Sequence, residues 1–130
     1  MARAPQQRPA LARNFRVDLG KGIDSTTISQ VILPRFPAQP EYDVEPLLTL
    51  RRAASADRAF HDWWWEETRG GGAKTRTVTV SMLAADMQPA FAWRFSEARP
   101  AALRYGLLDA TADDVLVETL ELAFGRMERV

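Results

Sequence analysis

Two segments in which apolar and polar side chains alternate place the strongest constraint on how this chain can fold. They are "TRTVTVSM" (75–82) and "FAWRFSEA" (91–98), and "MQP" lies between them at 87–89. Alternation with a period of two is typical of a strand that buries one face. The two segments therefore predict an antiparallel hairpin with "MQP" at its turn. The alternating apolar residues are Val78, Val80, Met82, Phe91, Trp93 and Phe95.

Other segments have the composition of strands as well. The predicted strands are 14–20, 26–33, 47–52 and 99–106, the last a separate strand weakened at its start by Pro100. The stretch from Pro34 to Pro46 contains four prolines, counting both of these. Because proline has no N–H to donate to a sheet, we expect an irregular connection there.

The stretch "AASADRAFHDWWWEETRGGG" changes to helical spacing and predicts a helix over about 56–68. Ser55 or Asp57 can cap its start, and the glycines from Gly70 end it. The apolar stripe of this helix consists of Ala56, Ala59, Phe60, Trp63 and Trp64. Successive helical residues are about 100° apart around the axis, so Trp65 lies beside the stripe.

Trp65 has three interpretations: the shoulder of the core stripe, a ligand site, or a foot in a membrane. The shoulder is the most common role of a single tryptophan beside such a stripe. The membrane foot is excluded because acidic residues, in place of lysines, flank the helix. These acidic residues are Asp57, Asp62, Glu66 and Glu67.

The last segment, "ATADDVLVETLELAFGRMERV" (110–130), fits a strand and a helix. In a strand, Leu116, Leu120, Leu122 and Phe124 share a face that Glu118 interrupts. In a helix, Thr111 and Asp114 resemble a capping box, and local propensity slightly favours this second form. The pattern of this segment alone leaves both forms open.

Length and composition indicate one soluble globular domain. The chain has 130 residues, 17 basic and 17 acidic residues, and no cysteine. Without cysteine there is no disulfide, thiolate zinc site or cysteine nucleophile. Residues 1–13 contain three arginines and no acid, so we expect a flexible basic arm ahead of a single domain over 14–130.

Motifs for catalysis, cofactors, metals and membranes are missing from the sequence. The single histidine, His61, is typical of a helix flank, and "RGGGAK" (69–74) lacks the spacing of a phosphate loop. The cluster of Asp109, Asp113 and Asp114 is more typical of a turn than of an acid/base pair. No apolar run approaches the ~20 residues of a membrane span. We therefore expect neither an enzyme nor a cofactor or metal site, no membrane anchor, and folding in the cytoplasm.

Several segments, taken in order, resemble the contractile phage tail tube proteins. "LLTLRRAASADRAFHDWWWEE" is similar to the family's Leu-Thr-Leu-basic strand and the short helix with paired tryptophans that follows it. "RTVTVSML", "FAWRFSEARPAALRYG" and "DDVLVETLELAFGRME" are similar to its later strands. "NFRVDLG" and "ISQVILPRF" are similar to its opening strands, so the resemblance extends over about 14–130.

The resemblance implies a mainly β fold: an antiparallel β-sandwich or barrel with one flanking helix. It implies that protomers join edge to edge into rings, here a hexamer, which stack into the inner tube of a phage tail or a related injection particle. It also implies that 110–130 ends in a strand, where Glu118 and Glu121 face opposite sides. The assembly candidates are Phe60, Trp63, Trp64, Trp65, Trp93, Glu118 and Glu121.

One departure from the family concerns a longer insertion that usually engages neighbouring subunits. Here "FPAQPEYDVEP" (36–46) stands in its place. We expect either a minimal tube protein or a specialised paralogue at a tube end, an initiator or a terminator. The implied partners are further copies of the chain, neighbouring rings, and sheath and baseplate proteins.

The alternative function is that of a small β-sandwich binding module. In it, Trp65, Trp93 or Tyr105 would stack on a sugar or on single-stranded nucleic acid. Because the charges balance, the electrostatic attraction on which nucleic-acid binding depends is weak. We therefore expect no direct recognition of nucleic acid.

Overall fold

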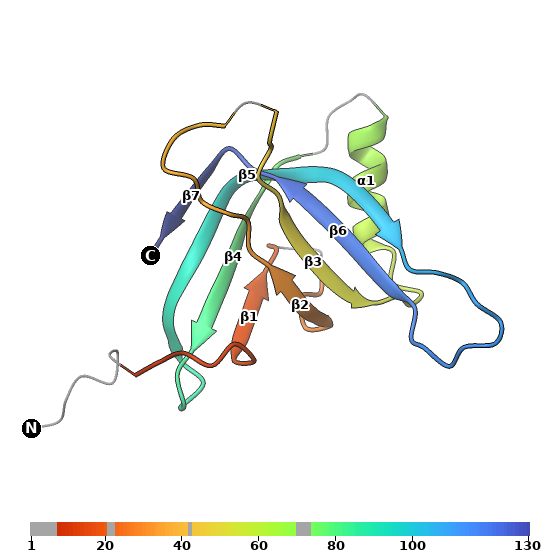
Figure 1. Cartoon of the computed structure of the whole chain (residues 1–130), viewed down its shortest axis with the longest axis horizontal. Coiled ribbons are helices and arrows are strands. Elements are labelled where there is room, and N and C mark those ends of the chain that lie inside the picture. The colour runs from red at the N-terminus through yellow and green to blue at the C-terminus, as the bar shows by residue number, and fades with distance from the viewer. Residues whose placement is uncertain (1–7, 21–22, 42, 70–73) are drawn as a thin grey trace, which may run out of the picture.

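Most of the regular secondary structure is β-strand in the computed structural model, which describes residues 8–20, 23–41, 43–69 and 74–130 (Figure 1). In chain order the strands are β1 (Phe15–Asp18), β2 (Ile28–Ile32), β3 (Leu48–Ala53), β4 (Arg76–Leu83), β5 (Pro89–Tyr105), β6 (Val117–Ala123) and β7 (Arg126–Arg129). The helix α1 (Ala59–Thr68) stands between β3 and β4. All pairings are antiparallel, which confirms the predicted fold class of a mainly β protein with one flanking helix.

The long strand β5 joins two groups of strands. Its first half pairs with β4 on one side and β7 on the other, and β1 lies beyond β4. Its second half pairs with β6, beyond which lie β3 and then β2. Figure 1 shows the two groups diverging from β5. The predicted hairpin of 75–82 and 91–98 is confirmed as β4 and β5, with Met87 in its turn at a φ of 66°.

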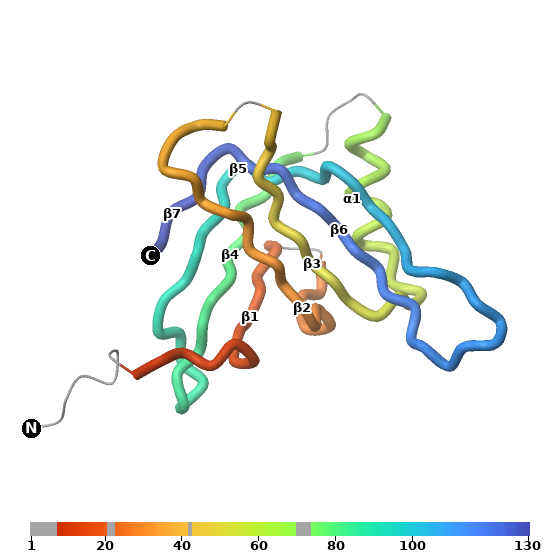
Figure 2. Tube along the Cα trace, in the orientation of Figure 1, coloured from red at the N-terminus to blue at the C-terminus, as the bar shows by residue number. Residues whose placement is uncertain are grey.

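The prediction of two separate strands at 91–98 and 99–106 is wrong, because β5 runs through both. The strand β5 bends at Glu97, whose φ is 58°. Figure 2 shows that the chain turns from β6 into β7 alongside this bend. Pro100 does not end the strand, because the β5–β6 register shifts between Pro100 and Ala102. A residue without an N–H is tolerated where the ladder is irregular.

The last segment contains two strands, β6 and β7, after the end of a loop. The strand that the family resemblance implies is therefore confirmed, and the helix favoured by local propensity is wrong. β6 lies between β3 and β5, so its backbone groups are paired on both edges. The expected capping box does not form: the backbone N–H and the hydroxyl of Thr111 donate to Asp109 Oδ1 at 2.9 and 2.7 Å. Pairing with two neighbouring strands outweighs a small difference in local propensity.

The helix begins at Ala59, later than the predicted start near residue 56. Asp57 Oδ1 accepts a hydrogen bond from the Ala59 N–H at 2.9 Å, and its other oxygen is held by Arg52 at 3.2 Å. Ala56 therefore stays outside the helix and is exposed, which corrects its placement in the apolar stripe. Phe60 and Trp63 pack into one core with residues of both strand groups, among them Val17, Leu50, Val78, Phe95 and Leu120.

Candidate functional site

The three consecutive tryptophans have three different environments. Trp63 is buried, and its indole N–H donates to the carbonyl of Lys74 at 3.2 Å. Trp64 is half-buried, so it belongs to the core stripe only in part. Trp65 remains 47% exposed. The helix therefore presents one large apolar side chain to the outside.

Trp65 belongs to a small aromatic cluster on the outer face of α1. Its ring stacks on His61, with centroids 6.2 Å apart and planes inclined by 11°. Trp64 lies 5.7 Å from His61, and the guanidinium of Arg69 lies 5.9 Å from the Trp65 ring. We call His61, Trp64, Trp65 and Arg69 the α1 cluster. An exposed group of this kind is typical of a contact surface between proteins.

A charged network lies inside the protein at Arg52, which is only 1% exposed. Its Nε donates to Glu118 Oε1 at 2.8 Å, and its other nitrogens reach a carboxylate oxygen and the carbonyl of Asp57, each at 3.2 Å. The guanidinium also lies 3.9 Å from the centre of the Phe60 ring. Burying a charge is costly unless it is paired and hydrogen-bonded, and here most of the donors are used. The network thereby holds the start of α1 against β3 and β6.

Tyr105 completes this network from β5. Its hydroxyl donates to Glu118 Oε2 at 2.9 Å, so both carboxylate oxygens of Glu118 have partners within the chain. Burial raises the pKa of Tyr105 above its usual value, and the hydrogen bond to the Glu118 carboxylate and its negative charge raise it further. Each of these effects disfavours the charged phenolate.

The buried network was not predicted: Arg52 was not a candidate, Asp57 was considered only as a helix cap, and Tyr105 only as a stacking residue of the alternative binding module. One signal for the network was nevertheless present in the sequence. Leu48, Leu50 and Arg52 alternate on the same face of the predicted third strand. A charge on the apolar face of a strand requires a buried partner of opposite charge. The sequence pattern alone does not say that this partner is Glu118, 66 positions further along the chain.

The remaining predicted residues lie apart from the α1 cluster. Trp93 is half-buried and packs edge to face on Phe91, with ring centroids 5.4 Å apart. The arginine near these rings is Arg129, which lies 4.2 Å from Phe91. Glu121 faces the side opposite Glu118 and lies 3.8 Å from Arg104. The seven candidates therefore do not form a single site.

Four unpaired strand edges border the described sheet: β1, β7, β2 and the second half of β5, which from Arg99 to Tyr105 pairs with β6 alone. Charged residues occur in β1 ("FRVD"), in β7 ("RMER") and in the second half of β5, which contains Arg99 and Arg104. In contrast, β2 ("ISQVI") has no charge, and Ile32 is exposed. Short length and charged side chains are the usual means of keeping an edge strand from pairing with another chain. The strand β2 is short but has no charged side chain. It is therefore the edge most suited to pairing.

Neither a metal site nor a membrane-spanning helix is found among the residues that the structure describes. Among them, no group of three or more His, Asp or Glu side chains is arranged to hold a metal ion. In the same part of the chain, no helix is long and apolar enough to cross a membrane.

Comparison with known proteins gives a family and a fold. The family model described as T4-like virus tail tube protein gp19 matches residues 37–128. No curated protein sequence matches the chain. Among solved structures, a chain from the sheath/tube terminator of PVC, an extracellular contractile injection system, has a TM-score of 0.79 and 18% identity over 95% of this chain and 98% of that chain.

Two further structures have the same fold. A chain from the PVC sheath-tube complex in its extended state has a TM-score of 0.75 and 18% identity, over 97% of this chain and 94% of that chain. A chain from the baseplate of the anti-feeding prophage has a TM-score of 0.70 and 22% identity, over 95% and 97%. At these identities the likeness concerns the fold alone.

Proposed function

Because the chain belongs to the T4-like virus tail tube protein family, it is a structural subunit of the tube of a phage tail or a phage-tail-like injection system, and we propose that it closes into rings by pairing sheet edges between copies. The role requires no catalytic step and no cofactor. We infer that the subunits fold in the cytoplasm and assemble there into the particle.

The observation that carries the proposed ring is the uncharged edge of β2. An exposed edge strand presents unpaired N–H and C=O groups, which are a template for a further strand. Pairing β2 with an edge of a neighbouring copy satisfies these groups and covers Ile32. Such a contact joins two different surfaces of neighbouring copies. It closes into a ring when the rotation from one copy to the next is a whole fraction of a full turn. A hexamer is the ring size that we propose.

The position of the subunit within the tube depends on the connection between β2 and β3. Over 33–47 the described residues form neither a helix nor a strand. An extended hairpin that could reach the next ring is therefore lacking among them. This favours a subunit at a tube end, which contacts a ring on one side and a terminator, baseplate or sheath partner on the other.

Size-exclusion chromatography with light scattering, followed by negative-stain imaging of each peak, tests this function. We expect closed rings, and a tube-end subunit should give single rings or short stacks. Long tubes formed by the protein alone would support a tube-body subunit and overturn the tube-end position. A monomer at all accessible concentrations would contradict self-assembly.

A further inference from the structure

The loop between β5 and β6, residues 107–116, exposes apolar side chains that have no partner in the chain's own core. Leu107 is 87% and Leu108 79% exposed, and Val115 is exposed as well. The loop projects from one end of the long axis of the molecule (Figure 1). Large apolar residues gathered on a projecting loop are typical of a contact with another protein.

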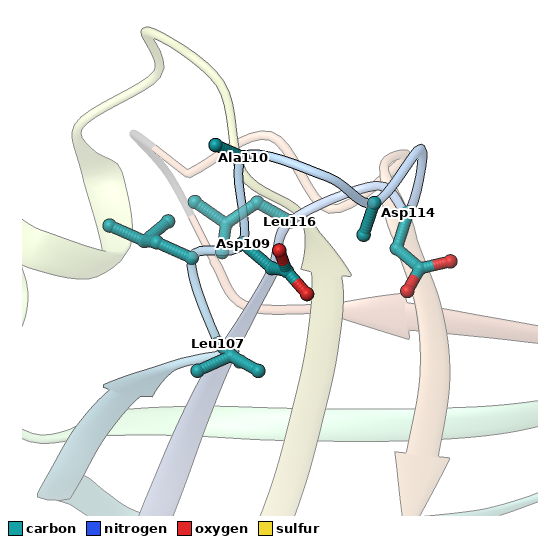
Figure 3. A pocket seen from close by; sticks show the side chains of 7 residues that line it. Leu107, Asp109, Ala110, Asp114 and Leu116 are labelled. Atoms are coloured by element: carbon teal, nitrogen blue, oxygen red, sulfur yellow. The ribbon is translucent and has the colours of Figure 1, made fainter.

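The same loop surrounds an open hollow of about 530 Å³. Leu107, Leu108 and Leu116 supply its apolar lining, and Asp109 and Asp114 supply carboxylates. Figure 3 shows Asp109 beside Leu116, with Asp114 on the opposite limb of the loop. The hollow therefore offers leucine side chains and negative charge together, which suits a short peptide segment with a leucine between two cations.

The charge of the loop is of one sign and is not neutralised locally. Asp109, Asp113 and Asp114 are its ionisable residues, and the loop has no basic residue. Among the described residues, none of the three takes part in an ion pair, in contrast to Asp57, Glu118 and Glu121. Hydrogen bonds from Thr111 lower the pKa of Asp109, so its carboxylate stays charged into mildly acidic solution.

A segment with the matching chemistry precedes β1. Residues 8–13 read "RPALAR", with exposed Arg8 and Arg13 on either side of the exposed Leu11. The only described hydrogen bond between this segment's backbone and the rest of the backbone joins the Asn14 N–H to the Leu11 carbonyl at 2.9 Å. Figure 1 shows this segment at the end of the long axis opposite the 107–116 loop.

We propose that residues 8–13 of one copy dock in the hollow of the 107–116 loop of a neighbouring copy. Leu11 packs against the leucines of the hollow, and Arg8 and Arg13 lie against Asp109 and Asp114. This inference rests on the proposed function, because it supplies a second contact between subunits of the same assembly.

Charge complementarity identifies the arm as the occupant. Residues 1–13 contain three basic and no acidic residues, and residues 107–116 contain three acidic and no basic residues. Because the whole chain has 17 basic and 17 acidic residues, the residues outside these two segments are neutral overall. The α1 cluster is a weaker match, because it contains a single arginine, Arg69, and the same helix exposes the acidic residues Asp62 and Glu66. Residues 8–13 and the 107–116 loop lie at opposite ends of the molecule. This position also favours a head-to-tail contact, which repeats from one subunit to the next.

The contact can be trapped with single-cysteine variants, because the natural chain has no cysteine. Leu11→Cys carries one affinity tag and Leu108→Cys carries another, and the two proteins are mixed and oxidised at the concentration where rings form. We expect a disulfide-linked dimer that carries both tags. Leu11→Cys mixed with Val44→Cys is the matched control, because Val44 is also exposed but lies in the β2–β3 connection, and this pair should not link.

Charge reversal gives an independent readout. Asp114→Lys or Arg13→Glu alone should raise the concentration needed for assembly about three- to tenfold, because an attraction becomes a repulsion. The two changes combined should restore assembly. Glu45→Lys makes the same change of net charge as Asp114→Lys, at an exposed residue of the β2–β3 connection, and should leave assembly unchanged.

The two proposals fail differently in these experiments. If the natural chain forms rings, and the Leu11–Leu108 pair does not link while Asp114→Lys assembles normally, the docking of the arm is overturned and the ring remains. If the natural chain stays monomeric at every concentration, the proposed ring is overturned and the docking of the arm with it.

Discussion

The guanidinium of Arg52 lies 2.8 Å from the carboxylate of Glu118, and both side chains are almost completely buried. The two residues are direct cross-strand neighbours in the β3–β6 register. Tyr105 faces Glu118 from β5, and Asp57 reaches Arg52 from the start of α1. A charged network at the junction of three strands and a helix specifies their relative positions, because each charge is costly without its partner.

We expect Arg52→Met to lower the free energy of unfolding by about 3–5 kcal/mol, because it leaves the Glu118 carboxylate buried and unpaired. Urea denaturation followed by tryptophan fluorescence measures the change. Arg52→Met combined with Glu118→Leu should recover part of the loss, since it removes both charges. Arg104→Met, which removes an exposed partner of Glu121, is the control and should cost about 0–1 kcal/mol. Equal effects of Arg52→Met and Arg104→Met would contradict the role of the buried network.

The raised pKa of Tyr105 predicts a loss of stability in alkaline solution. The folded protein keeps the phenol proton at a higher pH than the unfolded chain does, so the contribution of Tyr105 is fully present below about pH 10. It is lost as the pH rises from there through the pKa of the folded state. The urea midpoint should fall more steeply for the natural chain than for Tyr105→Phe between pH 9 and about pH 11. Parallel curves would show that Tyr105 makes no such contribution.

Separate substitution of two tryptophans of α1 should distinguish folding from assembly. Trp63→Ala removes a buried ring and should cost about 3–5 kcal/mol of folding free energy. Trp65→Ala removes an exposed ring, so we expect a small change in the urea midpoint and weaker assembly by light scattering. If Trp65→Ala assembles like the natural chain, the α1 cluster is not part of the interface between copies.

A lysine in the β2 edge should prevent edge pairing while leaving the monomer folded. Ile32→Lys places a charge on an exposed residue of that edge, and we expect rings to be lost at concentrations where the natural chain forms them. Thr79→Lys is the control, because β4 is paired on both sides at Thr79, with Asp18 and Arg94 opposite. Analytical ultracentrifugation of both variants measures the difference. Rings formed by Ile32→Lys would show that β2 is not the pairing edge.

Alternation along the chain was enough to predict the hairpin of β4 and β5, because each strand has one apolar and one polar face. The buried Phe60 and Trp63 followed from helical spacing in the same way. Spacing did not reveal that Pro100 lies inside a continuous strand, because that depends on a shifted register with β6. It also placed the helix start too early, because Asp57 is held by Arg52 from another strand.

By itself, the sequence determined the strands and the helix that have one clear apolar face, and the resemblance to a family added the strand character of residues 110–130. The tertiary structure decided what depends on residues far apart in the chain. It paired Arg52 with Glu118, bent β5 at Glu97, and placed residues 8–13 and the 107–116 loop at opposite ends. The physical reason is that local pattern records which side chains prefer burial, whereas register and docking depend on partners that local pattern does not specify.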